Sequence, residues 1–122
     1  MLLTPLQAYQ VMDRFLFQYY SQNPSEELGM LIGSMTRFEN GTFSDPTVWT
    51  DWEKALQLTM GRNSRIINDC MAYCAMVSFI NMQQAFRDCP SMCRLQQYLN
   101  NSNKDESWQQ WSRLVNLLNE NQ

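Results

Sequence analysis

Four cysteines, spaced as two Cys-x3-Cys pairs, are the residues whose types and spacing most suggest chemistry in this sequence. Cys70 and Cys74 form one pair, Cys89 and Cys93 form the other, and 14 residues separate the pairs. Two antiparallel helices could bring the four thiols together as two disulfides or as a metal site. The intervening segment, however, contains neither Gly nor Pro and is expected to be one unbroken helix. At a rise of about 1.5 Å per residue, Cys74 and Cys89 would lie about 22 Å apart, whereas a disulfide needs Cα atoms within about 7 Å. We therefore expect four reduced thiols, with no disulfide and no metal site.

The twin Cys-x3-Cys spacing resembles that of the small chaperones of the mitochondrial intermembrane space, in which two disulfides join a helix hairpin. That resemblance implies a redox-linked helical chaperone as an alternative function. The helix geometry instead favours cysteines that serve as small apolar side chains on a core helix, as expected in a reducing cytoplasm. Counting thiols in the native protein separates the two hypotheses, because four free thiols exclude the chaperone.

An aromatic helix is the second candidate for function. Asp45 followed by Pro46 is typical of a helix N-cap and first helical residue. Trp49, Trp52 and Leu56 then recur at i, i+3 and i+7, which gathers them on one helical face. The sequence therefore predicts a capped helix with an indole-rich face, which ends near residue 61.

Two interpretations of this helix are open. The indoles of Trp49 and Trp52 could simply fill the core between the first and third helices. Alternatively, one of them is partly exposed beside Asp51 and Glu53 and forms an aromatic contact surface with an acidic edge, because Trp is enriched at interface hot spots and a carboxylate can pair with a basic residue of a partner. The preceding loop, residues 37–43, contains two Phe and one Gly and fits either a connector or a binding loop.

The composition excludes several classes of enzyme. The chain contains no His, which is the commonest general base and the commonest metal ligand. Ser-His and Cys-His catalysis are thereby impossible, and a zinc hydrolase is disfavoured. The adjacent Glu26 and Glu27 are explained by their place in the first turn of a helix, where the helix dipole favours acids. We expect a protein that is not an enzyme and that needs no cofactor.

Charge is distributed unevenly along the chain. The net charge is −3; residues 1–60 contain seven acidic and three basic residues, a balance of −4, whereas residues 61–122 contain five and six, a balance of +1. An acidic half repels nucleic acid and favours basic partners, so direct binding of DNA or RNA is not expected.

The fold expected from these patterns is all-α, a single-domain bundle of about six helices over residues 1–122. Met, Leu, Gln and Ala are abundant, and Gly and Pro number only four each. Capping signals and apolar periodicity predict helices over residues 5–21, 26–35, 46–60, 63 or 64 to about 88, 90–99 and 105–118. The fourth is the most apolar and is expected at the centre of the bundle. No signal peptide or membrane span is expected, which makes the cytoplasm the default location.

The first half of the chain, residues 1–61, also carries a family resemblance, whereas residues 62–122, the core helix and the C-terminal helices, match no pattern. The resemblance rests on three blocks, which are Gln7-Ala8-Tyr9-x2-Met12-x2-Phe15-Leu16-x2-Tyr19-Tyr20, Glu27-Leu28-Gly29-x-Leu31-Ile32-Gly33-x-Met35 and, after Asn40-Gly41, Asp45-Pro46-x2-Trp49-x-Asp51-Trp52. They resemble small helical bacterial proteins of polymorphic-toxin and contact-dependent growth-inhibition loci, which serve there as immunity proteins.

The resemblance implies a cytoplasmic protein that binds one cognate toxin domain and covers its active site or substrate groove. Nuclease toxins present basic clefts, into which an acidic inhibitor with aromatic anchors can be steered. From their chemistry, the candidate toxin-binding residues are four acids and three aromatic residues, namely Glu39, Asp45, Asp51 and Glu53 with Phe43, Trp49 and Trp52. A helical adaptor or scaffold, which would self-associate without a toxin, is a further alternative. The sequence does not define the oligomeric state.

Overall fold

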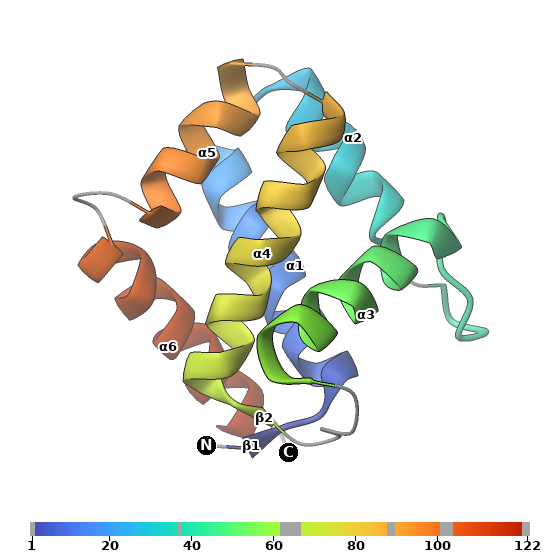
Figure 1. Cartoon of the computed structure of the whole chain (residues 1–122), viewed down its shortest axis with the longest axis vertical. Helices are drawn as coiled ribbons and strands as arrows, with labels where there is room; N and C mark the ends of the chain where they lie inside the picture. The colour runs from blue at the N-terminus through green and yellow to red at the C-terminus, as the bar shows by residue number, and fades with distance from the viewer. Residues whose placement is uncertain (1, 37, 62–66, 88–89, 101–103, 121–122) are drawn as a thin grey trace.

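The computed structural model describes residues 2–36, 38–61, 67–87, 90–100 and 104–120. In these ranges the chain forms six helices and one pair of two-residue strands (Figure 1). The elements are β1 (Leu2–Leu3), α1 (Pro5–Gln22), α2 (Glu26–Ser34), α3 (Pro46–Met60), β2 (Ile67–Asn68), α4 (Asp69–Arg87), α5 (Pro90–Asn100) and α6 (Lys104–Glu120). The prediction of an all-α bundle is confirmed. Among the described residues, no helix is both long and apolar enough to cross a bilayer.

Side-chain caps define where the first three helices begin. Thr4 and Gln7 form a reciprocal capping box, in which the Gln7 amide donates to the Thr4 hydroxyl at 3.1 Å and the Thr4 amide donates to Gln7 Oε1 at 2.9 Å. Ser25 caps α2, and Asp45 caps α3. Gly61 follows α3 with a φ of 85°, a left-handed value that glycine adopts without strain. The local signals in the sequence therefore locate these ends within about one residue, as is typical of such boundaries.

The start of the fourth helix differs from the prediction. Residues 63 and 64, where the helix was expected to begin, lie outside the described residues, and Ile67–Asn68 is a strand rather than helix. This strand pairs antiparallel with β1, with Leu3 opposite Ile67, and both of these side chains are buried. α4 begins only at Asp69. The apolar spacing of this segment fits a helix, but pairing with the N-terminal strand takes precedence here.

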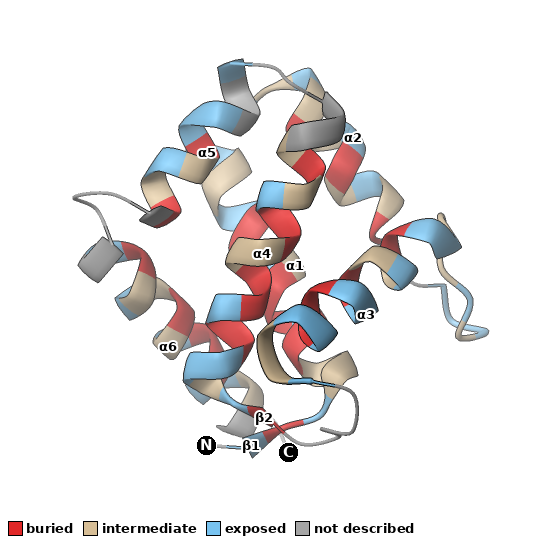
Figure 2. Ribbon diagram, in the orientation of Figure 1, coloured by how far each residue is buried: buried red, intermediate tan, exposed pale blue. Residues whose placement is uncertain are grey.

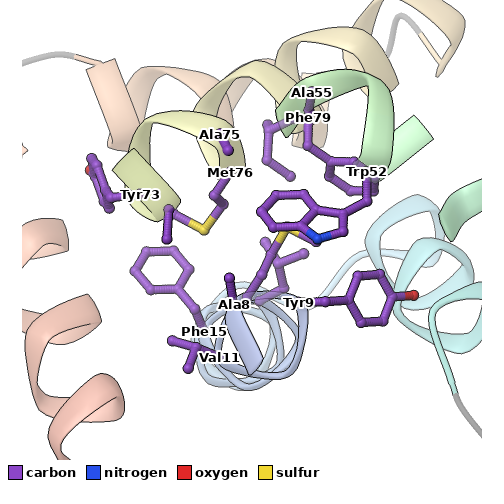
Figure 3. Close-up of a cluster of buried hydrophobic side chains, with 14 of the residues drawn as sticks. Ala8, Tyr9, Val11, Phe15, Trp52, Ala55, Tyr73, Ala75, Met76 and Phe79 are labelled. Carbon is purple, nitrogen blue, oxygen red and sulfur yellow. The ribbon is translucent and has the colours of Figure 1, made fainter. Parts of the chain in front are cut away.

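The core lies between α1 and α4, which cross near the middle of the molecule with α3 on one side and α6 on the other (Figure 1). Buried residues concentrate on the facing sides of these helices (Figure 2). In the cluster shown in Figure 3, Phe15 of α1 lies beneath Met76 of α4, and Trp52 of α3 reaches between the same two helices. The prediction that the fourth helix is central is confirmed.

The cysteines of α4 are not the core fillers that the sequence predicted. Cys70 and Cys74 are exposed on α4, and Cys93 is exposed on α5. All three are thiols rather than halves of disulfides, whereas Cys89 lies outside the described residues. α4 continues without a break to Arg87, and Cys74 lies on its exposed side, in the second turn. Small residues of the same helix, Ala72 and Ala75, take the buried positions instead.

The apolar side chains of α6 are buried to different extents. Trp111 and Leu114 are buried, Trp108 and Leu118 are half-buried, and Leu117 is 46% exposed. The Trp111 indole donates its N–H to the Asp69 carbonyl oxygen at 3.1 Å, which joins the last helix to the first residue of α4. α6 packs mainly against α1 and leaves Leu117 at the edge of that contact.

Candidate functional site

The two tryptophans of the candidate aromatic helix have different environments. Trp52 has no exposed surface, and its indole N–H donates to the Pro5 carbonyl oxygen at 3.1 Å. Trp49 is only half-buried. Trp52 therefore joins the start of α1 to α3 inside the core and has no surface to offer a partner. Its selection as a candidate anchor is wrong, and the aromatic surface of α3 depends on Trp49.

Trp49 belongs to a small group of stacked rings. Its indole lies parallel to the Phe43 ring, with centroids 5.1 Å apart and an interplanar angle of 12°. The Tyr9 ring meets both at a steep angle, with its centroid 5.6 Å from that of Phe43 and 5.2 Å from that of Trp49. Edge-to-face and offset-stacked geometries are favoured by the quadrupoles of aromatic rings. The half-exposed pair Phe43–Trp49 is thus held in one orientation by a buried tyrosine.

Tyr9 is itself fixed by a hydrogen bond. Its hydroxyl donates to the Met35 carbonyl oxygen at 2.9 Å, at the C-terminal end of α2. Burial raises the pKa of the Tyr9 hydroxyl, and the nearby carboxylates of Asp13 and Asp45 raise it further. The hydroxyl therefore stays protonated and remains a donor under all physiological conditions. One side chain of α1 in this way links the end of α2 to the rings at the start of α3.

The loop between α2 and α3 is tied together by its own hydrogen bonds. The Phe38 amide donates to the Thr42 carbonyl oxygen at 2.8 Å, and the side-chain oxygen of Asn40 accepts from both the amide and the hydroxyl of Thr42, at 3.0 and 2.7 Å. Gly41 has a φ of 89°, which favours glycine at this turn. Phe38 remains 53% exposed. The loop is thus a hydrogen-bonded turn, and the ring of Phe38 is exposed on it.

Phe38 was not among the candidate residues, although its loop was. The loop contains two Phe, at 38 and 43, and only Phe43 was selected from the sequence. In the structure Phe43 packs on Trp49 and Tyr9. Phe38 is 53% exposed and belongs to the same loop, which projects beyond the start of α3 (Figure 1). The signal that could have selected Phe38 is its position next to the turn residues Asn40-Gly41, since residues at a turn tip have few neighbours to cover them.

The four candidate acids also divide into structural and exposed members. Asp45 is the N-cap of α3, and its Oδ1 accepts from the Thr47 amide at 3.0 Å and from the Thr47 hydroxyl at 2.6 Å. Asp51 faces α4, where its Oδ2 accepts from Nε2 of Gln83 at 3.0 Å. Gln83 is only 3% exposed, so this carboxylate satisfies a buried amide. The carboxylates of Asp45 and Asp51 therefore both accept hydrogen bonds within the fold.

Glu53 and Glu39 are the exposed acids. Glu53 follows Trp49 by four residues, which places it one turn further along the same side of α3. Asp51 and Glu53 are two positions apart, about 200° around a helix, so they cannot form one acidic edge. Glu39 is exposed in the turn beside Phe38. The structure thus brings Phe38, Glu39, Phe43, Trp49 and Glu53 onto the loop and the adjoining side of α3; we call these five residues the Trp49 surface.

The described residues offer no comparable arrangement for binding a metal ion. They contain no group of three or more Cys, Asp or Glu side chains placed to hold a metal ion. Rings with exposed edges and faces, flanked by carboxylates, can instead bury apolar area and pair with cations. The Trp49 surface is therefore suited to binding a protein surface.

In comparisons with known proteins, no family model, curated protein or solved structure matches this chain.

Proposed function

We propose that this protein is an immunity protein, which binds a cognate toxin domain of the nuclease class through the Trp49 surface and covers the toxin's active site or substrate groove. The observation that carries the proposal is the half-exposed ring pair Phe43–Trp49, held by Tyr9 and adjoined by the exposed carboxylate of Glu53. The resemblance of residues 1–61 to immunity proteins supports the same function. The alternatives are the redox-linked chaperone and the helical adaptor.

Rigid rings suit this function because binding then costs little conformational entropy. Each immobilised flexible side chain costs about 0.5–1.5 kcal/mol on association. The stacking on Phe43 and the edge contact with Tyr9 hold Trp49 in place before any partner arrives. Trp is also the residue type most enriched among interface hot spots. The affinity is therefore expected to depend on Trp49 first.

The negative charge of the first 60 residues is expected to speed association with a basic toxin cleft. The first 60 residues have a balance of −4, and two of their acids, Glu39 and Glu53, are exposed on the Trp49 surface. A cleft that binds RNA or DNA is basic, and complementary charge can raise association rates about 10- to 1000-fold at low salt. A cationic side chain of the toxin could contact the Trp49 ring and Glu53 together. The cytoplasm, where toxin and inhibitor would meet, also fits the exposed thiols of Cys70, Cys74 and Cys93.

The test uses the toxin domain encoded beside this gene, expressed with and without this protein. We expect coexpression to protect the cells and the purified pair to form a stable complex. Trp49→Ala should abolish protection while the helix content measured by circular dichroism stays unchanged. Leu58→Ser is the matched control, because Leu58 is 75% exposed on the same helix but outside the Trp49 surface. Failure of the wild-type protein to bind or protect against the neighbouring toxin would refute the proposal. Self-association without toxin binding would favour the adaptor.

A further inference from the structure

The turn between α2 and α3 contains two neighbouring residues that can react with each other. Asn40 is followed directly by Gly41, and this is the only Asn-Gly sequence in the chain. Asn40 is exposed, and Gly41 has the left-handed φ of 89°. The backbone nitrogen that follows an asparagine can close a five-membered ring on the asparagine side chain. Glycine hinders this ring closure least, because it has no Cβ.

Two hydrogen bonds of the turn reach the atom on which charge would develop in this reaction. When a nitrogen attacks Cγ of Asn40, the negative charge of the tetrahedral intermediate forms on Oδ1. The amide and the hydroxyl of Thr42 already donate to Oδ1, at 3.0 and 2.7 Å. Donors placed at such an oxygen polarise the carbonyl and stabilise the oxyanion, as they do in enzymes of acyl transfer. The turn thus activates the Asn40 side chain for attack.

The attacking nitrogen is held by one further hydrogen bond. The Gly41 amide donates to the Phe38 carbonyl oxygen at 2.9 Å, so this bond has to open before the nitrogen can attack. Both residues lie in a loop at the surface, where local opening costs far less free energy than unfolding of the whole domain. The donors on Oδ1 both come from Thr42 and do not include the bond that has to open.

We propose that Asn40 is a site of spontaneous deamidation, in which the two Thr42 donors promote attack by the Gly41 nitrogen. This nitrogen loses its proton to water and forms a bond to Cγ of Asn40. The bond from Cγ to Nδ2 then breaks, and Nδ2 leaves as ammonia. Water opens the resulting succinimide at either of its two carbonyl carbons, which gives aspartate or isoaspartate. Water is the only co-reactant, and no atom is oxidised or reduced.

Deamidation changes the charge beside the Trp49 surface. A neutral amide next to Glu39 becomes a carboxylate, so the net charge of the chain changes from −3 to −4. The aspartate product keeps an oxygen that can accept from Thr42. Isoaspartate instead carries the main chain through the former side chain and should break the hydrogen bond from the Phe38 amide to the Thr42 carbonyl oxygen. The reaction itself does not depend on the proposed function.

The experiment incubates the purified full-length protein at neutral pH and follows each asparagine by tandem mass spectrometry of its peptides. We expect deamidation at Asn40 and none over the same period at Asn81, an exposed asparagine of α4 that is followed by Met82. The chain unfolded in urea serves as a reference for the reactivity of the sequence alone. A native protein in which Asn40 stays unmodified while the unfolded chain reacts would overturn the proposal.

Variants at position 42 test the activation. Thr42→Val keeps the shape of the side chain and the backbone amide but removes the hydroxyl donor, so Asn40 should deamidate about three- to tenfold more slowly. Thr42→Ser keeps the hydroxyl and should react at the wild-type rate. Thr42 is exposed, so both variants should fold, which circular dichroism checks. An unchanged or faster rate in Thr42→Val would show that the hydroxyl does not promote the attack and would overturn the proposal.

Discussion

Trp49 and Trp52 carry the same ring three residues apart on α3, yet they occupy different environments. Trp52 has no exposed surface and hydrogen-bonds to Pro5, whereas Trp49 is half-buried and stacked on Phe43. Three residues correspond to a rotation of about 300°, which leaves the two indoles about 60° apart around the helix. That offset suffices to move one ring from the core to its boundary. Spacing at i, i+3 therefore indicates a shared face and does not indicate shared exposure.

The largest expected effect comes from the buried indole. Trp52→Ala should lower the free energy of unfolding by about 3–5 kcal/mol, because it removes a fully buried aromatic side chain and the hydrogen bond to Pro5. Urea denaturation followed by circular dichroism measures this loss. In the fraction that remains folded, toxin affinity should fall less than it does in Trp49→Ala, because Trp52 contacts Tyr9 but has no exposed surface. A mild effect on stability, below about 1 kcal/mol, would show that the core tolerates the cavity and would weaken the contrast between the two indoles.

Trp49→Ala should have the opposite effect, with a large loss of toxin affinity and a small loss of stability. We expect affinity for the toxin domain to fall at least about 30-fold, as for an interface hot spot, while stability falls by only about 1–2 kcal/mol through the lost ring contacts. Isothermal titration calorimetry and urea denaturation of the same preparation give the two numbers. Trp49→Phe is a useful intermediate, since it keeps a ring against Phe43 with less exposed area. Wild-type affinity in Trp49→Ala would place the interface elsewhere.

Asp51 and Glu53 extend the comparison to charge. Asp51→Ala leaves the buried amide of Gln83 without its acceptor and should cost about 1–3 kcal/mol of stability. Glu53→Gln should leave stability unchanged within about 0.5 kcal/mol, because Glu53 is exposed. Its effect should be a slower association with the toxin and a weaker dependence of the rate on salt. Stopped-flow association at two ionic strengths measures this, and identical effects of the two variants on binding would contradict the division of roles.

Much of the fold follows from local signals in the sequence. The capping box of Thr4 and Gln7 and the Asp45-Pro46 start of α3 occur as predicted, because a cap depends only on residues within a few positions of each other. The strand at Ile67 was missed because its partner, Leu3, lies far away in sequence. The exposure of Cys70 and Cys74 was missed for a related reason, since apolar periodicity alone does not say which side of a helix its neighbours cover.

The candidate site was predicted only in part, and the errors have geometric causes. The helix repeat alone separates Asp51 from Glu53 by about 200°, so the sequence already excluded a common acidic edge. Which of the two acids faces α4 depends on the packing of α3 against α4, however, and only the structure shows that Asp51 meets Gln83. Likewise, only the structure shows that Tyr9 of α1 contacts Phe43, whereas Phe38 remains exposed.

The smallest expected effect concerns Asp13, the half-buried acid whose charge acts on Tyr9, the residue that contacts both indoles. Desolvation raises the folded-state pKa of Asp13 above its ordinary value of 3.8. The native state therefore holds this proton at pH values where the unfolded chain has lost it. The resulting stabilisation is fully present below pH 3.8 and is lost as the pH rises through the folded-state pKa.

Asp13→Asn has no such titration, so the stability of wild type relative to this variant should decrease as the pH rises from about 3.8 towards neutrality. Urea denaturation of both proteins between about pH 3.5 and 7 measures the difference, and Glu53→Gln is the control, because Glu53 is exposed to solvent. A relative stability that instead rises with pH would mean that the ionised carboxylate of Asp13 is stabilised in the native state, with the charge of Arg14 outweighing desolvation.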